Sequence, residues 1–245
     1  MTTPVRVAVV GSGPAGIYAS DLLVKSDLDV QIDLFEKMPT PFGLIRYGVA
    51  PDHPRIKGIV QSLHNVMEKE EIRFLGNIEV GKDITVEEMR EYYDAIIFAT
   101  GATADKEMGI PGEDLPGSIA SVDFVGWYNG IPADRDLDVQ LDSDTETAVI
   151  IGQGNVALDC ARILLLSREC LKRTDITRHA YRRLADSRVR RVIIIGRRGP
   201  MQAAYKIKEF RELTKMEDCR LRIELSGQQE REALSFSDEL LVRIF

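Results

Sequence analysis

Short apolar runs recur along the chain, and several of them end at a glycine-rich turn. Residues 5–10 (VRVAVV) form such a run, which is typical of a strand buried in a parallel sheet. Apolar residues at helical spacing follow over 17–25, and a second strand is predicted over 31–35, ending at Glu36. Another buried strand is predicted over 93–99. The order strand, turn, helix, strand predicts an α/β unit.

The same plan returns in the second half of the chain. Residues 147–151 and 191–195 are predicted strands, and 158–166 is a predicted helix between them. We therefore expect an α/β fold with two Rossmann-like, doubly wound dinucleotide-binding domains, over 1–104 and 105–245, joined internally by right-handed crossovers. The acidic stretch 134–146 is interpreted as a solvated surface connection.

Residues 38–54 interrupt this regular pattern. Six prolines and glycines in this stretch exclude regular helix, and a long irregular segment with several apolar residues is typical of a functional loop. Residues 55–70 are predicted to be helical.

Composition narrows the function classes. The net charge of -7 argues against a general nucleic-acid binder, and no stretch approaches the roughly 18 apolar residues of a membrane span. Because strand-like sequence starts at Val5, we expect no targeting segment and predict the bacterial cytoplasm, or the mitochondrial matrix after removal of a presequence. The three cysteines, Cys160, Cys170 and Cys219, match no zinc site and no redox pair, so free thiols are expected.

A G-x-G-x-x-G motif occupies residues 11–16, between a predicted strand and a predicted helix. Gly11 allows a tight turn, Gly13 lets the backbone approach a pyrophosphate, and Gly16 allows the helix to pack closely on the strand. The helix N-terminus offers N–H groups and a positive dipole end to the phosphates. Glu36, 20 positions after Gly16, is placed to accept hydrogen bonds from ribose hydroxyls. These features together predict a dinucleotide site.

A second motif, G-x-G-x-x-A, occupies residues 152–157. Here Arg197 and Arg198 follow the partner strand in place of an acid. Two guanidinium groups bind a 2′-phosphate by charge and by paired hydrogen bonds, whereas a carboxylate would repel it. The second motif therefore favours NADP(H) over NAD(H).

Several longer stretches resemble the adrenodoxin reductase family, which includes mitochondrial and bacterial ferredoxin–NADP reductases. The stretches are 41–44 (PFGL), 48–54 (GVAPDHP), 110–113 (IPGE), 124–129 (FVGWYN), 152–159 (GQGNVALD) and 196–200 (GRRGP). The resemblance covers about residues 5–215. It implies reduction of FAD by NADPH in one hydride step, followed by single-electron transfers to a ferredoxin- or adrenodoxin-type iron–sulfur protein.

The resemblance also implies roles for individual residues. FAD would lie against Gly11, Gly13, Ala15, Gly16, Glu36, Leu44 and Val80, and NADPH against Gln153, Gly154, Asn155, Val156, Arg197 and Arg198. Glu209 matches a position near the nicotinamide nucleotide, and His53 matches a histidine near the flavin that is a candidate for proton relay. Without the resemblance, His53 is interpreted as turn chemistry and Glu209 as a surface residue in a helix rich in ion pairs.

The family runs to roughly twice this length, and its second half returns to the flavin domain. Nothing in this sequence corresponds to that half, and the resemblance fades after about Leu213. We therefore expect the flavin domain to lack its C-terminal segment and the NADP domain to be incomplete. On its own the chain is expected to bind FAD weakly and to turn over poorly.

Three other functions stay open at this point. A disulfide reductase of the thioredoxin reductase kind needs a close cysteine pair, which the chain lacks. A glutamate synthase small subunit has a similar two-nucleotide plan, but the sequence over 49–54 argues against it. The third alternative is a nucleotide-binding fragment without catalytic activity.

Basic residues are concentrated over 162–198, where 12 Lys or Arg stand against three acids. Two interpretations stay open: a solvated helix face, or a positive surface that steers an acidic ferredoxin.

Overall fold

The computed structural model describes residues 3–102, 106–141, 144–196, 202–216 and 219–224. The chain divides into two compact units, Met1–Glu107 and Met108–Phe245. Unit 1 contains, in order, β1 (Val5–Val10), α1 (Pro14–Val24), β2 (Val30–Glu36), α2 (Leu44–Tyr47), α3 (Pro54–Lys57), α4 (Val60–Met67), β3 (Ile72–Gly76), α5 (Val86–Tyr92) and β4 (Ala95–Phe98). Unit 2 contains α6 (Ser121–Asn129), the 3-10 helix η1 (Pro132–Asp134), β5 (Thr147–Ile151), α7 (Asn155–Leu165), α8 (Arg168–Leu171), α9 (Arg178–Ala185), β6 (Arg191–Ile195) and α10 (Ile207–Thr214).

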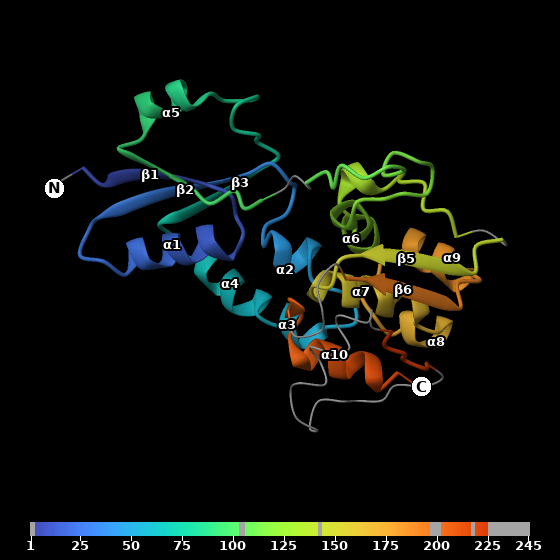
Figure 1. Cartoon of the computed structure of the whole chain (residues 1–245). Coiled ribbons are helices and arrows are strands. Elements are labelled where there is room, and N and C mark those ends of the chain that lie inside the picture. The colour runs from blue at the N-terminus through green and yellow to red at the C-terminus, as the bar shows by residue number, and fades with distance from the viewer. Residues whose placement is uncertain (1–2, 103–105, 142–143, 197–201, 217–218, 225–245) are drawn as a thin grey trace. The chain divides into compact units, whose positions relative to one another are not determined.

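Unit 1 is built on a parallel sheet with strand order β3-β2-β1-β4. Alternate residues of β1 point to opposite faces of this sheet. Val7 and Val9 pack with Ile17 of α1 and Leu63 of α4 on one face. The other face is covered by α5, whose Met89 packs with Ala8, Val10 and Phe35 (Figure 1). The α/β class with parallel strands, predicted from the sequence, is confirmed.

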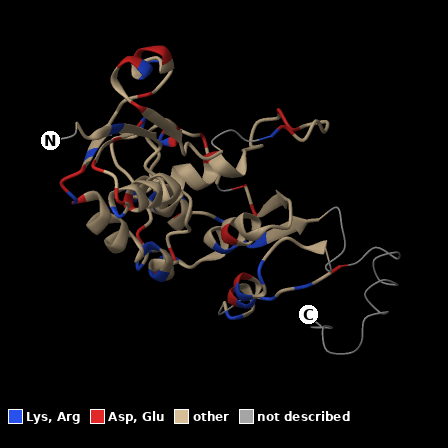
Figure 2. Cartoon of the chain, turned by 90° about the vertical axis from the view of Figure 1, so that its left-hand side faces the viewer, with Lys and Arg blue, Asp and Glu red and all other residues tan. Residues whose placement is uncertain are grey.

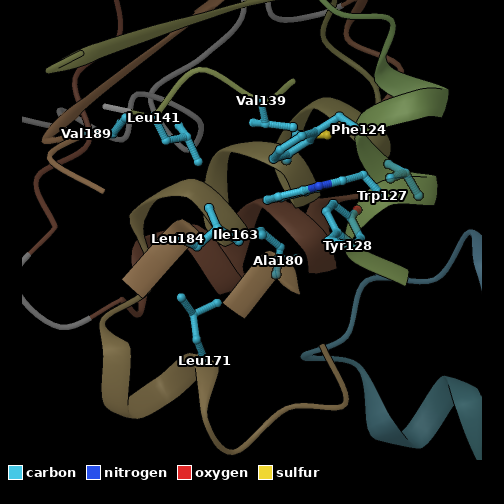
Figure 3. Close-up of a cluster of buried hydrophobic side chains, with 12 residues drawn as sticks. Phe124, Trp127, Tyr128, Val139, Leu141, Ile163, Leu171, Ala180, Leu184 and Val189 are labelled. Carbon is cyan, nitrogen blue, oxygen red and sulfur yellow. The ribbon is translucent and has the colours of Figure 1, made fainter. Parts of the chain in front are cut away.

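Unit 2 has a parallel pair of strands, β5 and β6. Its core brings aromatic side chains of α6 against α7, α8 and α9 (Figure 3). Trp127 stacks on Phe124 with ring centroids 5.7 Å apart, and Tyr128 meets Phe124 edge-on at 5.3 Å. All three side chains are buried.

The two faces of the β5–β6 pair differ. Ala148, Ile150 and Val192 pack against the core of unit 2. Among the described residues, the opposite face carries exposed apolar side chains, namely Val149, Ile151, Ile193 and Ile195.

Several predicted elements need correction. The helix begins at Pro14 rather than at residue 17, because proline suits the first helical turn. The predicted helix over 55–70 is two helices, α3 and α4, separated at Gly58. Within the segment 38–54, for which regular helix was excluded, α2 forms a single turn.

The acidic stretch 134–146 is not simply a solvated connection. Val139 and Leu141 are buried in the core of unit 2. They alternate with the exposed residues Asp138 and Gln140, so one side of this part of the segment is buried and the other faces solvent.

No helix within the described ranges combines the length and apolarity that a membrane crossing requires.

A charged cluster ties β2 to β3 inside unit 1. Asp33 faces Arg73 across the two strands, and the guanidinium donates two hydrogen bonds of 2.7 Å to the carboxylate. The Tyr93 hydroxyl also donates to Asp33. Burial opposes ionisation of Asp33, but the hydrogen bonds from Arg73 and Tyr93 outweigh it and hold the carboxyl pKa below its usual range. Burial is the largest cause, and the hydrogen bond to Asp33 the next, that raises the pKa of Tyr93 to about 12.

We predict that Arg73→Met lowers the free energy of unfolding by about 2 kcal/mol at neutral pH, because two hydrogen bonds to a buried carboxylate are lost. The pKa of Asp33 is depressed in the folded state, so its contribution is present above the unfolded pKa of about 4 and is lost as pH falls through the folded value. Urea unfolding at several pH values measures both effects. The difference between wild type and variant should disappear in acid, and a difference independent of pH would contradict the assignment. Lys82→Met, which breaks the exposed 3.6 Å pair with Glu79, is the control and should cost less than about 1 kcal/mol.

Candidate functional site

The first glycine turn joins β1 to α1, and two of its glycines are required by the fold. Gly11 has φ +106°, and its N–H donates to the carbonyl of Phe35 at 2.8 Å. A Cβ on Gly11 would lie 2.4 Å from the Ala99 carbonyl oxygen, and one on Gly16 would lie 1.9 Å from the Gly11 oxygen. No side chain fits at either position.

Gly13 is different. It is the N-cap of α1 with φ −71°, a conformation open to any residue, and the nearest atom to a Cβ there would be Gly43 Cα at 4.0 Å. No side chain caps the N–H groups of this helix end. Packing and backbone conformation therefore do not require glycine at position 13, where the sequence predicts the approach of a pyrophosphate to the helix N-terminus.

Glu36 lies beside this turn, at the end of β2. One carboxylate oxygen, Oε2, accepts hydrogen bonds from the Ser12 backbone N–H at 3.1 Å and from the Ser12 hydroxyl at 2.7 Å. The other, Oε1, accepts from the N–H of Met38 at 3.0 Å. The predicted ribose acceptor is thus next to the predicted phosphate turn. Ser12 was not among the predicted site residues. The sequence does show a hydroxyl residue in the glycine turn and an acid at the end of the next strand, and this pattern could have predicted their contact.

The loop that follows β2 folds back onto the glycine turn. The Phe42 N–H donates to the Ser12 carbonyl at 2.9 Å, and the side chain of Phe42 is buried. Phe42 has φ +88°, which is rare for a residue with a side chain, and Gly43 has φ +45°. Backbone strain of this kind persists where the surroundings demand it and is concentrated at functional sites.

The other residues predicted for the first nucleotide occupy varied positions. Ala15 and Leu44 are exposed, and Leu44 begins α2 directly after Gly43. Val80 is half-buried and lies shortly after Ile78, whose N–H donates to the Glu36 carbonyl at 3.0 Å. His53 is half-buried at the N-cap of α3. Its proton-relay role stays a prediction.

The second glycine turn joins β5 to α7 in unit 2. Gly152 has φ +128°, and its N–H donates to the Ile195 carbonyl at 2.9 Å. Gly154 is the N-cap of α7 with φ −104°, and a Cβ there would have no atom within 4 Å. Ala157 is buried at the third position, where the first turn has Gly16. At Gly154, as at Gly13, the backbone conformation and the free space around it would both allow a side chain.

Two neighbouring segments support this second turn. The Gln153 side chain lies over Gly196, where a Cβ would come within 2.3 Å of Gln153 Oε1. The Ala204 N–H donates to the Gln153 carbonyl at 3.0 Å, and the Lys206 N–H donates to Asn155 Oδ1 at 2.7 Å. Val156 is exposed. Arg197 and Arg198, predicted to bind the 2′-phosphate, lie outside the described residues.

Glu209 lies on α10, which packs against α7. Its interpretation as a surface residue is wrong, because only 9% of it is exposed. Near it, the buried Arg162 pairs with Asp159 of α7 at 2.7 Å and with Glu212 of α10 at 3.8 Å. The contact with Glu212 links α7 to α10, whereas the contact with Asp159 lies within α7. A role of Glu209 beside the nicotinamide stays a prediction.

The three cysteines are free, as expected. Burial raises the pKa of the Cys160 thiol to about 12, and burial also raises that of Cys219. Because the thiolate is the reactive form, Cys160 is poorly suited to thiol–disulfide exchange.

Comparison with known proteins decides the family. Residues 5–213 match the family model described as pyridine nucleotide-disulphide oxidoreductase. The chain belongs to this family. The family's description refers to disulphides, but the free cysteines show no thiol pair in this member.

Within the family, the resemblance to adrenodoxin and ferredoxin reductases is confirmed. The chain is 52% identical over 221 residues to the mitochondrial NADPH:adrenodoxin oxidoreductase of Salvelinus fontinalis, covering 90% of this chain and 44% of that protein. It is 48% identical to the NADPH-ferredoxin reductase FprA of Mycobacterium tuberculosis, covering 87% of this chain and 48% of FprA. The solved structure of FprA in complex with NADPH matches with a TM-score of 0.83 and 49% identity, over 88% of this chain and 48% of that one. The chain therefore spans less than half the length of these relatives.

We predict that Gly13→Ala and Gly154→Ala fold normally but each weaken one nucleotide. Both backbones accept alanine, so the added methyl group meets only the incoming ligand, at a cost of roughly 1–3 kcal/mol, or about 5- to 150-fold in affinity. Titration calorimetry with FAD and with NADPH measures this. Gly13→Ala should affect FAD alone and Gly154→Ala NADPH alone, so each variant controls for the other.

Gly16→Ala is the contrasting variant. Its methyl group would overlap the Gly11 carbonyl, so it should lower the melting temperature of the chain in the absence of any nucleotide. Equal loss of stability in all three variants would show that the glycines serve only the fold.

Proposed function

We propose that this chain forms the FAD- and NADPH-binding part of a flavoprotein reductase that passes electrons from NADPH to a ferredoxin- or adrenodoxin-type iron–sulfur protein. The observation that carries the proposal is the pair of open glycine positions, Gly13 and Gly154, each at the N-cap of a helix that follows a parallel strand. The names of the relatives, NADPH:adrenodoxin oxidoreductase and NADPH-ferredoxin reductase, support this function.

The residues of the first turn fit FAD. The backbone at Gly13 leaves room for a pyrophosphate at the N-terminus of α1, and the Glu36 carboxylate beside it suits a ribose with free hydroxyl groups. Gly11, Ala15 and Gly16 complete the proposed contact surface.

FAD, when bound, supplies the conversion between a two-electron hydride donor and one-electron acceptors. The protein's own residues bind and orient the nucleotides.

The second turn fits NADPH. Gln153, Gly154, Asn155 and Val156 line the open helix end, and Arg197 and Arg198 supply the positive charge that a 2′-phosphate requires. The end of β6 and the residues Gly196, Arg197 and Arg198 that follow it include no acid, whereas β2 ends at Glu36. The two sites are therefore proposed to select different nucleotides through opposite charges. We propose the bacterial cytoplasm or the mitochondrial matrix as the location, and the relatives include a mitochondrial protein and a bacterial one.

Flavin absorbance tests this function most directly. The purified chain, titrated with an excess of FAD, should shift the flavin spectrum as FAD binds, and NADPH added without oxygen should bleach the bound flavin slowly. NADH should bleach it far less, because it lacks the 2′-phosphate. Bound FAD that NADPH does not bleach would indicate a nucleotide-binding protein without reductase activity. Failure to bind either nucleotide would contradict the proposal.

A basic surface on unit 2 is proposed to receive the iron–sulfur partner. The exposed basic residues between α8 and β6 are Arg168, Lys172, Arg173, Arg178, Arg182, Arg183, Arg188, Arg190 and Arg191. Figure 2 shows the Lys and Arg residues of the chain in blue and its Asp and Glu residues in red. On a chain with net charge -7, this local reversal of sign suits an acidic protein.

The structure sharpens the choice of variants. Arg183 donates to the Val139 carbonyl at 2.9 Å, so replacing it would also disturb a packed segment. Arg178 and Arg182 lie one turn apart on α9 and are exposed. Arg178→Glu/Arg182→Glu should therefore slow reduction of an acidic ferredoxin by roughly tenfold at low salt. This is at the lower limit of the rate changes that electrostatic steering produces.

The same double variant should leave ferricyanide reduction unchanged, and the defect should shrink as salt is added. Lys215→Glu/Arg220→Glu changes the net charge equally at exposed positions outside this surface and is the control. Equal slowing by both double variants would count against docking at α9.

A further inference from the structure

Ser12 is the buried residue that holds Glu36. No part of Ser12 is exposed, and both of its hydrogen-bond donors, the backbone N–H and the hydroxyl, reach the same carboxylate oxygen, Oε2. The hydroxyl contact, at 2.7 Å, is typical of a strong bond to a charged acceptor. A packing role for Ser12 alone does not require its hydroxyl to point at Glu36.

The second carboxylate oxygen has a different environment. Oε1 accepts one bond, from the Met38 N–H at 3.0 Å. Since each carboxylate oxygen offers about two acceptor positions, the contacts of the described residues fill Oε2 and leave one position on Oε1. Glu36 thus presents a single defined acceptor rather than a freely rotating carboxylate.

This arrangement fixes a negative charge as well as an acceptor. Met38 and Ser12 hold the carboxylate from both sides, so its position is set before any nucleotide arrives. A preorganised acceptor binds a ribose hydroxyl without the cost of ordering a side chain. The same fixed charge repels a phosphate at the ribose 2′ position.

We propose that Ser12 is a positioning residue whose hydroxyl orients Glu36, so that the first turn accepts a dinucleotide with a free ribose diol and rejects one with a 2′-phosphate. This inference rests on the proposed function, in which FAD occupies the first turn. It assigns to Ser12 a role in nucleotide selection that acts through Glu36 rather than by direct contact.

A double-mutant cycle tests the proposal. FAD affinity is measured by titration calorimetry for the full chain, Ser12→Ala, Glu36→Gln and the double variant. Ser12→Ala should weaken FAD by about tenfold, equivalent to about 1.4 kcal/mol. Glu36→Gln should weaken it at least as much. The double variant should match Glu36→Gln, because the Ser12 hydroxyl has no effect once the charged acceptor is gone.

Ser20 provides the matched control. It is equally buried in the same unit, and its hydroxyl donates to the Gly16 carbonyl at 2.9 Å rather than to Glu36. Ser20→Ala should therefore change FAD affinity by less than about twofold. Should Ser12→Ala fold poorly, Ser12→Cys keeps a similar volume with a weak donor and should show a smaller loss of FAD affinity.

Nucleotide selection provides a second readout. FAD bound to the chain is displaced with ADP or with adenosine 2′,5′-bisphosphate, so that only ligands of the first turn are counted. Wild type and Ser20→Ala should prefer ADP, and both Ser12→Ala and Glu36→Gln should reduce that preference. A merely structural role of Ser12 would weaken both competitors equally.

The outcomes separate this inference from the proposed function. If the unchanged chain binds FAD but Ser12→Ala binds it equally well, the inference fails and the function stands. If the losses from Ser12→Ala and Glu36→Gln simply multiply, Ser12 acts independently of Glu36 and the inference also fails. If the unchanged chain binds no FAD, the proposed function and the inference are both overturned.

Discussion

The contact between Gly16 and the carbonyl of Gly11 is the constraint on which the first unit depends. It brings the first turn of α1 against the end of β1 at a separation that no side chain would permit. The same turn packs Gly11 against Ala99, just beyond β4, and so joins the carboxyl ends of two neighbouring strands. With these contacts in place, the N-terminus of α1, the end of β2 with Glu36 and the returning loop at Phe42 meet at one edge of the sheet.

The two turns use glycine for different reasons at different positions. Gly11 and Gly152 are set by backbone conformation, since both have positive φ. Gly16 is set by packing, and the second turn accepts Ala157 at that place. Only Gly13 and Gly154 are required by neither. Because neither backbone conformation nor packing requires glycine at these two positions, they indicate a bound nucleotide more specifically than the motif as a whole does.

Much of this could be predicted from the sequence where local pattern and tertiary environment agree. Strands β1, β5 and β6 have the predicted bounds, because each is a short run rich in β-branched residues that is followed by a glycine. Strand β3 was not predicted. Its Arg73 is an exposed residue paired with Asp33, 40 positions earlier, and local sequence carries no sign of such a partner. Ser12 was missed for a different reason, because its hydroxyl in the glycine turn and the acid at the end of β2 could have been paired from the sequence.

The chain has one tryptophan, and its position makes the two units separable by spectroscopy. Trp127 lies in the core of unit 2, stacked on Phe124 and in edge contact with His179. Tryptophan fluorescence therefore reports the unfolding of unit 2 alone. Unit 1 is silent at those wavelengths, so its stability must be followed through tyrosine or through the backbone circular dichroism that both units share.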